Sequence, residues 1–208
     1  MTVYILDDSL VFPNPQSAES NGLLAVGGDL SVESLLLAYR SGIFPWYSEG
    51  DPLMWFSPDP RLIIFFDNLH VSSKLKKVVR SKTYEVRFDT AFKDVIIKCA
   101  MVERVGQNGT WITDEMVEAY IRLHNEGYAH SVETFHEGKL VGGLYGVSLG
   151  GVFFGESMFF EMSNASKVAL YSLVDKLRSW GFDFIDSQVP NDHMLGLGGK
   201  EVKRTAFL

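Results

Sequence analysis

Three strand-like runs follow one another in AHSVETFHEGKLVGGLYGVSLGGVFFGESMFF, residues 129–160. The runs span 129–135, 139–149 and 151–160. The dipeptides between them, Glu137-Gly138 and Gly150-Gly151, are typical of hairpin turns. We therefore expect an antiparallel meander of three strands.

A helix and a further strand are predicted downstream of the meander. Apolar residues at helical period predict a helix that begins after a cap at Ser163 or Asn164 and ends at Gly181. Residues 182–188 then form a short buried strand. Because a helical crossover joins parallel strands of one sheet, this strand should run parallel to one already present.

Upstream of the meander the sequence predicts a strand at 84–89, a helix at 91–103, a loop at 106–109 and a helix from a Thr113 cap to Gly127. The complete order is strand, helix, helix, three antiparallel strands, helix and strand. This order resembles the acyl-CoA N-acyltransferase (GNAT) architecture, an α/β fold whose mixed sheet opens to admit an acyl donor. Similarity of element order alone does not assign a function.

Residues 1–65 differ from the rest because turn signals containing Pro and Gly recur throughout them. Between these turns Ser31 can cap a helix through Tyr39, with Gly42 just past its end. We therefore expect a small, loop-rich N-terminal domain at 1–65 and a GNAT-like domain at 66–208.

The composition indicates a folded protein, because 46% of the 208 residues are hydrophobic and can bury a sizeable core. The N-terminus carries acidic residues where a signal peptide needs basic ones, and no apolar run approaches a membrane span. We therefore expect a cytoplasmic protein. The net charge of −7 argues against a protein that coats nucleic acid with its whole surface.

One short segment is basic, SSKLKKVVRSK at residues 72–82. It contains Lys74, and at helical spacing its apolar residues face inward and leave Lys76, Lys77 and Arg80 on one solvated face. Such a face is either an ordinary helix surface or a local contact for nucleic acid.

Two polar residues end the strand predicted at 182–188. Period-two geometry places Asp186 and Gln188 on one face, with their roots roughly 7 Å apart. At that separation a carboxylate and an amide oxygen can share one substrate nitrogen. The alternative is that both side chains satisfy backbone groups where the strand ends.

Glu156 is a carboxylate inside the apolar run 152–160, where a charge needs a partner or an exposed face. Alternation places it with Phe154 and Met158, unless Gly155 introduces a bulge. The residue either faces solvent or meets a cationic substrate.

Neither a metal nor a nucleotide cofactor is indicated. The histidines lack metal-ligand spacing, and the single cysteine, Cys99, has no second sulfur ligand and is interpreted as a buried, inert thiol. The sequence contains no Walker loop and no dinucleotide-binding motif. We therefore expect no cofactor.

Several longer strings together are similar to the leucyl/phenylalanyl-tRNA–protein transferase family. They are NGLLAVGGDL (21–30), GIFPWYSEGDPLMWFSPDPR (42–61), GTWIT (109–113), EAYIRLHNEGYAHSVE (118–133), LVGGLYGVSLGGVFFGESMF (140–159), NASK (164–167) and IDSQVPNDH (185–193). The resemblance covers nearly the whole chain, and strings of this length in this order are far more specific than a lone glycine motif.

The resemblance implies an enzyme without coenzyme A that transfers Leu or Phe, and Met more weakly, from aminoacyl-tRNA to an N-terminal Arg or Lys. This reaction belongs to N-degron protein degradation. The resemblance assigns the catalytic pair to Asp186 and Gln188: Asp186 polarises Gln188, whose carbonyl oxygen orients the attacking amine. We expect the enzyme to be a monomer.

The resemblance also implies the substrate contacts. The apolar pocket for the donor side chain is expected from Leu144, Phe153, Met158, Leu170 and Ile185. The remaining implied contacts are Trp46 and Trp111 near the terminal adenosine, Tyr120, Ser157, and Glu156 with Asn191 for the cationic acceptor residue. The basic helix with Lys74, Lys76, Lys77 and Arg80 becomes the landing surface for the tRNA acceptor stem.

Two alternatives belong to other classes of protein. An acetyl-CoA-dependent GNAT acetyltransferase fits the element order, but residues 161–167 lack the glycine-rich loop with which such enzymes hold pyrophosphate. A non-catalytic RNA-binding adaptor that uses only the basic helix leaves Asp186 and Gln188 unexplained.

Overall fold

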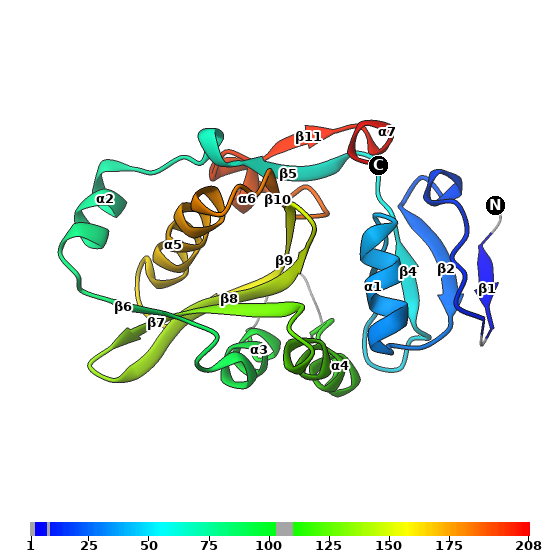
Figure 1. Cartoon of the computed structure of the whole chain (residues 1–208), viewed down its shortest axis with the longest axis horizontal. Helices are drawn as coiled ribbons and strands as arrows, with labels where there is room; N and C mark the ends of the chain where they lie inside the picture. The colour runs from blue at the N-terminus through cyan, green and yellow to red at the C-terminus, as the bar shows by residue number, and fades with distance from the viewer. Residues whose placement is uncertain (1–2, 8, 103–109) are drawn as a thin grey trace.

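The structure is a computed structural model that describes residues 3–7, 9–102 and 110–208. The last residue of the helix predicted at 91–103 and the loop predicted at 106–109 lie outside the described residues. The described residues form two sheets, a smaller one in the N-terminal unit and a larger one in the rest of the chain (Figure 1).

The smaller sheet has the strand order β1-β2-β4-β3. Its strands are β1 (Tyr4–Leu6), β2 (Leu23–Gly27), β3 (Phe44–Pro45) and β4 (Met54–Phe56), and the 3₁₀ helix η1 (Pro15–Ser17) precedes β2. Helix α1 (Val32–Arg40) begins after Ser31, whose hydroxyl accepts the N–H of Ser34. Just past its end Gly42 has a φ of 71°. The predicted helix and both of its end signals are confirmed.

The larger sheet contains the predicted meander. Strands β7 (Ala129–His136), β8 (Lys139–Leu149) and β9 (Val152–Phe160) pair in antiparallel order. The first turn has positive φ at both Glu137 (49°) and Gly138 (76°), as a type I′ hairpin requires. Strand β6 (Glu85–Phe88) pairs with β7 and forms that edge of the sheet.

Strand β10 (Phe184–Asp186) lies parallel to β9 after the crossover helix α5 (Ala165–Ser179), as predicted. On its other side β10 pairs with β5 (Arg61–Phe65), and β11 (Lys200–Val202) follows at the edge. This mixed sheet with its helices is the GNAT-like α/β architecture. Because β5 lies in the larger sheet, sheet membership divides the chain between Phe56 and Arg61, before the predicted boundary at residue 65.

Helices cover both faces of the larger sheet (Figure 1). Helices α3 (Phe92–Ala100) and α4 (Asp114–Asn125) lie on one face, and α5 lies on the other with α2 (Ser73–Arg80) packed against it. The short helices are η2 (Phe66–Asn68), α6 (Asp192–Gly196) and α7 (Arg204–Phe207). The face with α3 and α4 shares one apolar core with the N-terminal unit, whereas the face with α5 has a core of its own. The two units therefore pack together as one body.

Two further observations concern membranes and the cysteine. Among the described residues, no helix combines the length and the apolar character needed to cross a bilayer. Cys99 is completely buried in α3, as the sequence indicated.

Candidate functional site

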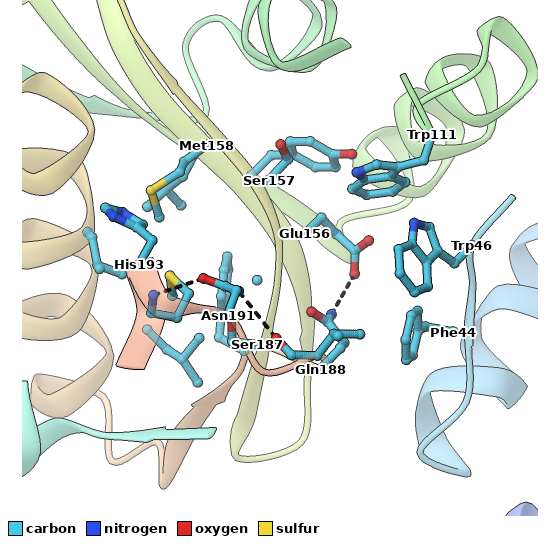
Figure 2. A pocket seen from close by; sticks show the side chains of 18 of the residues that line it. Phe44, Trp46, Trp111, Glu156, Ser157, Met158, Ser187, Gln188, Asn191 and His193 are labelled. Atoms are coloured by element: carbon cyan, nitrogen blue, oxygen red, sulfur yellow. Dashed lines mark hydrogen bonds between the residues drawn. The ribbon is translucent and has the colours of Figure 1, made fainter. Parts of the chain in front are cut away.

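A cavity of about 440 Å³ lies where the N-terminal unit meets the larger sheet (Figure 2). Its walls come from β3, β8, β9, β10, α5, α6 and the segments that lead into α4 and α6. The cavity extends past the carboxyl end of β10, next to its parallel neighbour β9. Ligands of open α/β sheets bind in this kind of position.

Most of the residues that line the cavity next to α5 are apolar. All five residues predicted for the donor pocket line it: Leu144 from β8, Phe153 and Met158 from β9, Leu170 from α5 and Ile185 from β10. Except for Met158, these side chains are also part of the buried core under α5. The structure thus brings these five residues together on one surface.

Glu156 reaches the cavity because β9 contains a bulge. Gly155 and Ser157 pair with adjacent residues of β8, so Glu156 is the extra residue between them. The bulge that the sequence allowed at Gly155 is therefore present, and simple alternation is wrong for this strand. Glu156, Ser157 and Met158 all line the cavity, whereas Phe154 packs into the core on the other face.

Three side chains donate hydrogen bonds to the Glu156 carboxylate. The Tyr39 hydroxyl donates to Oε1 at 2.7 Å, the Tyr120 hydroxyl to Oε2 at 3.3 Å, and Nε2 of Gln188 to Oε1 at 3.1 Å. The two tyrosine hydroxyls also contact each other. Burial, reinforced by the Glu156 charge, raises the pKa of both tyrosines well above the usual value, so they remain donors at physiological pH.

The pKa of Glu156 lies near neutral pH. Burial raises its pKa to about 7, although the hydrogen bonds from Tyr39 and Tyr120 lower it. The negative charge of Asp186 adds to the rise, and the positive charge of Arg61 opposes it. Glu156 is therefore a carboxylate whose charge changes in the physiological range.

Asp186 and Gln188 do not share a face, so the period-two prediction is wrong for this pair. β10 ends at Asp186, and Gln188 has a φ of 53°, which turns its side chain into the cavity beside Ile185. The Asp186 side chain is fully buried behind the cavity wall, and its Oδ1 accepts the backbone N–H of Gln188 at 3.0 Å. The contact between the two residues is thus made by the Gln188 backbone and not by its side-chain amide.

Two residues of the site, Arg61 and Tyr39, were not predicted from the sequence. Arg61, the first residue of β5, is fully buried, and its Nε and one terminal nitrogen donate to the two oxygens of Asp186 at 2.9 and 2.6 Å. Tyr39 is the closest donor to Glu156. A signal for the ion pair was available: a cation opens the apolar strand RLIIF, an anion ends the apolar strand FID, and buried charges need partners.

Aromatic side chains form the wall opposite α5 (Figure 2). Phe44, Trp46 and Trp111 line the cavity there, which includes both tryptophans that the sequence singled out. Tyr120 does not line the cavity. It is fully buried and reaches the site through its hydrogen bond to Glu156.

Asn191 lines the cavity, but its side chain also serves the local backbone. Its Oδ1 accepts the N–H of Met194 at 2.9 Å and so caps α6, and its Nδ2 donates to the Val189 carbonyl at 3.2 Å. His193, which the sequence analysis did not single out, lines the same part of the cavity (Figure 2). Burial and the charge of Lys167 lower the pKa of His193, which favours its neutral form.

The basic helix forms as predicted, at some distance from the N-terminal unit (Figure 1). Leu75 of α2 is buried, and Lys74, Lys76, Lys77 and Arg80 are exposed. The structure therefore separates these four cations from the cavity and presents them to solvent beside α5.

The side chains present bear on whether a metal ion or coenzyme A could bind. Among the described residues, no group of three or more His, Cys, Asp and Glu side chains is arranged to hold a metal ion. Helix α5 begins after Asn164, and residues 161–167 contain no glycine. The residues that usually form the pyrophosphate cradle of acetyl-CoA-dependent enzymes are therefore missing at this helix start.

The chain matches the family model for leucyl/phenylalanyl-tRNA protein transferase over residues 63–208, and the model for the N-terminal domain of that family over residues 28–59. The leucyl/phenylalanyl-tRNA–protein transferases of Nitratidesulfovibrio vulgaris (strain DP4) and Syntrophobacter fumaroxidans are each 56% identical to it, over 100% of this chain and 89% of theirs. The Myxococcus xanthus enzyme is 53% identical, over 100% of this chain and 90% of its own.

Solved structures show weaker similarity. A GCN5-related N-acetyltransferase from Kribbella flavida matches with a TM-score of 0.42 and 9% identity, covering 79% of this chain and 58% of that one. L-PGS from Bacillus licheniformis matches with a TM-score of 0.42 and 13% identity, covering 81% and 54%. Similarity at this level bears on neither substrate nor mechanism.

Proposed function

Because the chain belongs to the leucyl/phenylalanyl-tRNA protein transferase family, we propose that it transfers Leu or Phe, and Met more weakly, to proteins that begin with Arg or Lys. Transfer from aminoacyl-tRNA to protein is the activity of the family; the choice of amino acid and acceptor is the proposed part. One observation carries it: a single cavity contains both an apolar end and Glu156, and the Gln188 amide is hydrogen-bonded to Glu156. We also propose that the protein is a cytoplasmic monomer and needs no cofactor, and that the proteins it modifies enter N-degron protein degradation.

The apolar end of the cavity supports Leu and Phe as donors. Burying a side chain of this size against Leu144, Phe153 and Ile185 stabilises the complex by about 1.5–3 kcal/mol, whereas a polar side chain would lose its hydrogen bonds to water. Trp46 and Trp111 offer flat surfaces for the terminal adenosine, where stacking contributes about 1–3 kcal/mol.

Glu156 supports a cationic acceptor residue. It is the one carboxylate among the described residues that line the cavity, and the hydroxyls of Tyr39 and Tyr120 hold it in place. An Arg or Lys side chain can form a charge-assisted hydrogen bond with such a group. Asn191 lies on the same cavity wall as Gln188 and offers polar groups to the acceptor backbone.

The proposed chemistry is aminolysis of the aminoacyl ester. The neutral α-amine attacks the ester carbonyl, the C–N bond forms, the bond to the ribose oxygen breaks, and that oxygen takes the proton released by nitrogen. The Gln188 carbonyl oxygen accepts a hydrogen bond from the amine and stabilises the positive charge that develops on it during attack. Positioning of amine and ester side by side supplies much of the rate.

Charge reversal on α2 tests the tRNA part of the proposal. Replacing Lys76, Lys77 and Arg80 by Glu is expected to weaken productive binding of full-length charged tRNA by about 10-fold or more at low salt, because three phosphate contacts become repulsive. Transfer from a minimal aminoacyl-adenosine donor should remain near normal. The measurement is KM for each donor at two salt concentrations.

A second triple variant controls for net charge. Lys139, Lys200 and Lys203 are also exposed, and replacing them by Glu changes the net charge by the same amount on other surfaces. This control should bind charged tRNA nearly as well as the wild type. Equal losses with both donors, or in both triple variants, would show that α2 has no specific role in tRNA binding.

Narrowing the apolar end tests the donor pocket. Leu144→Phe should depress transfer of Phe more than transfer of Leu, because overpacking costs about 1–3 kcal/mol and falls hardest on the larger ring. The ratio of kcat/KM for Phe-tRNA and Leu-tRNA is the measurement, and using one tRNA body for both amino acids keeps all other contacts constant. An unchanged ratio would place the donor side chain elsewhere.

The decisive experiment is transfer of radiolabelled Leu from charged tRNA to a peptide beginning with Arg. The same peptide beginning with Ala is the control, and acetyl-CoA is offered as an alternative donor. We expect label only on the Arg peptide and no acetylation. Label on both peptides, or none on either, would reject the proposed acceptor specificity.

A further inference from the structure

We propose that Arg61 is a positioning residue for peptide-bond formation: it fixes Asp186, and through Asp186 the turn at Gln188, relative to the aromatic wall of the donor site. The inference rests on the proposed function, because the reaction it serves is aminoacyl transfer in the cavity. It concerns how the groups that contact the substrate are held.

Arg61 engages both oxygens of the Asp186 carboxylate. Its Nε donates to Oδ1 at 2.9 Å and its terminal nitrogen to Oδ2 at 2.6 Å, and the accessible surface of both side chains is 1% or less. A bidentate pair of this kind fixes both the position and the plane of the carboxylate. Asp186 does not line the cavity. The Asp186 carboxylate is therefore paired with the Arg61 guanidinium and does not face the cavity.

The fixed carboxylate in turn holds the backbone at Gln188. Oδ1 of Asp186 accepts the Gln188 N–H at 3.0 Å, in addition to the bond from Arg61. Gln188 needs such a restraint, because its φ of 53° lies in a region that residues other than glycine adopt at a cost. This conformation directs the Gln188 side chain toward Glu156. Loss of the restraint would move the amide that contacts the acceptor.

Arg61 also contacts the opposite wall of the site. Its remaining terminal nitrogen donates to the Gly42 carbonyl at 3.1 Å, two residues before Phe44. The guanidinium lies over the ring of Phe44 at 5.0 Å and over the ring of Phe207 at 4.5 Å. Phe44 itself lines the cavity. One side chain thus joins the end of β10, just before Gln188, to the segment that carries Phe44 of the aromatic wall.

Only an arginine satisfies all of these contacts. The planar guanidinium presents three nitrogens that donate in fixed directions and two faces for aromatic rings, whereas a lysine presents a single charged nitrogen. Arg61→Lys keeps the charge beside Asp186 but loses the second bond to the carboxylate and the bond to Gly42. This variant therefore separates the effect of the guanidinium geometry from the effect of the positive charge.

The test compares Arg61→Lys, Arg61→Gln, Asp186→Asn and the double variant Arg61→Gln/Asp186→Asn. The exposed pair of Arg178 with Asp67 provides the matched control, Arg178→Gln. Each variant is checked for folding by circular dichroism. The readouts are kcat and KM for transfer of Leu to an Arg peptide, and hydrogen exchange of the Gln188 amide without substrates.

We expect kcat to fall by about 10-fold in Arg61→Lys and by about 30-fold in Arg61→Gln and in Asp186→Asn, because small displacements of reacting groups are costly. The changes in KM should be smaller. The Gln188 amide should exchange faster in both Arg61 single variants. In the double variant no buried charge is left unpaired, but the contacts of the guanidinium with Gly42 and Phe44 are still missing, so kcat should recover to about the level of Arg61→Lys and not to that of the wild type. Arg178→Gln should match the wild type in every readout.

Two results would overturn the inference. One is a folded double variant no more active than Asp186→Asn, which would mean that the carboxylate charge takes part in the chemistry. The other is an Arg61→Lys variant whose kcat and rate of Gln188 amide exchange equal those of the wild type. This result would reject a positioning role for Arg61 even if the double variant does not fold. A wild-type enzyme that transfers no Leu would instead reject the proposed function, and the exchange measurement would still test the link from Arg61 to Gln188.

Discussion

Replacing Gln188 by Ala is expected to lower kcat for aminoacyl transfer by about 100-fold or more, with little change in KM for aminoacyl-tRNA. An N-terminal α-amine has a pKa of about 7.7–8.0, so much of it is protonated at neutral pH and cannot attack. In the proposed mechanism the Gln188 carbonyl oxygen selects the neutral amine in the correct orientation and stabilises the charge that forms during attack. Removing it affects the transition state and leaves the donor pocket intact.

Single-turnover transfer from a preformed complex with Leu-tRNA measures this step directly. Gln16→Ala, which removes an exposed glutamine of the N-terminal unit, is the matched control and should retain normal kcat. If Gln188→Ala keeps near-normal turnover while Leu-tRNA remains bound, the reaction depends on substrate positioning alone. In that case Gln188 would have no role in orienting the amine.

Much of the fold could be predicted because its signals are local. Glu137-Gly138 adopts the φ values that a two-residue hairpin requires, and the caps at Ser31 and Thr113 lie where the helices begin. Strand β5 shows the limit of such signals. It follows a turn-rich segment and was grouped with it, although its partners β10 and β11 lie more than a hundred residues later. Sheet membership of this kind depends on long-range pairing, which a local pattern does not encode.

The site was predictable to the extent that its residues follow family strings or regular strand geometry. Four of the five residues predicted for the donor pocket belong to such strings, Leu170 follows NASK in the predicted helix, and all five line one cavity. Two departures from regular geometry decide the polar end: the bulge at Glu156 and the left-handed conformation at Gln188. The first was recognisable from Gly155, whereas the second was not, because glutamine rarely adopts a positive φ. The role of Arg61 was not predicted because its partner, Asp186, lies 125 residues later in the chain.

Recognition of the acceptor by Glu156 should weaken as the pH falls through about 7, and Glu156→Gln should abolish this dependence. Because its pKa is raised to about 7, Glu156 is charged above that pH and neutral below it. The cationic side chain of the acceptor keeps its charge over the whole range, so the attraction is complete at high pH and lost at low pH. The tyrosine hydroxyls of Tyr39 and Tyr120 remain protonated and do not add a second transition.

The α-amine of the acceptor also titrates near pH 8, so its ionisation must be separated from that of Glu156. Peptides that begin with Arg or with citrulline, its neutral isostere, share the same amine, and the ratio of their kcat/KM values removes its contribution. At pH 8 we expect the Arg peptide to be preferred by about 10- to 100-fold. This ratio corresponds to the contribution of about 1.5–3 kcal/mol that a hydrogen bond to a charged group makes. The preference should shrink several-fold by pH 6 as Glu156 becomes protonated. In Glu156→Gln the ratio should be small at every pH. A wild-type ratio that stays constant between pH 6 and 8 would show that the charge of Glu156 does not select the acceptor, and that the cation is recognised by another group.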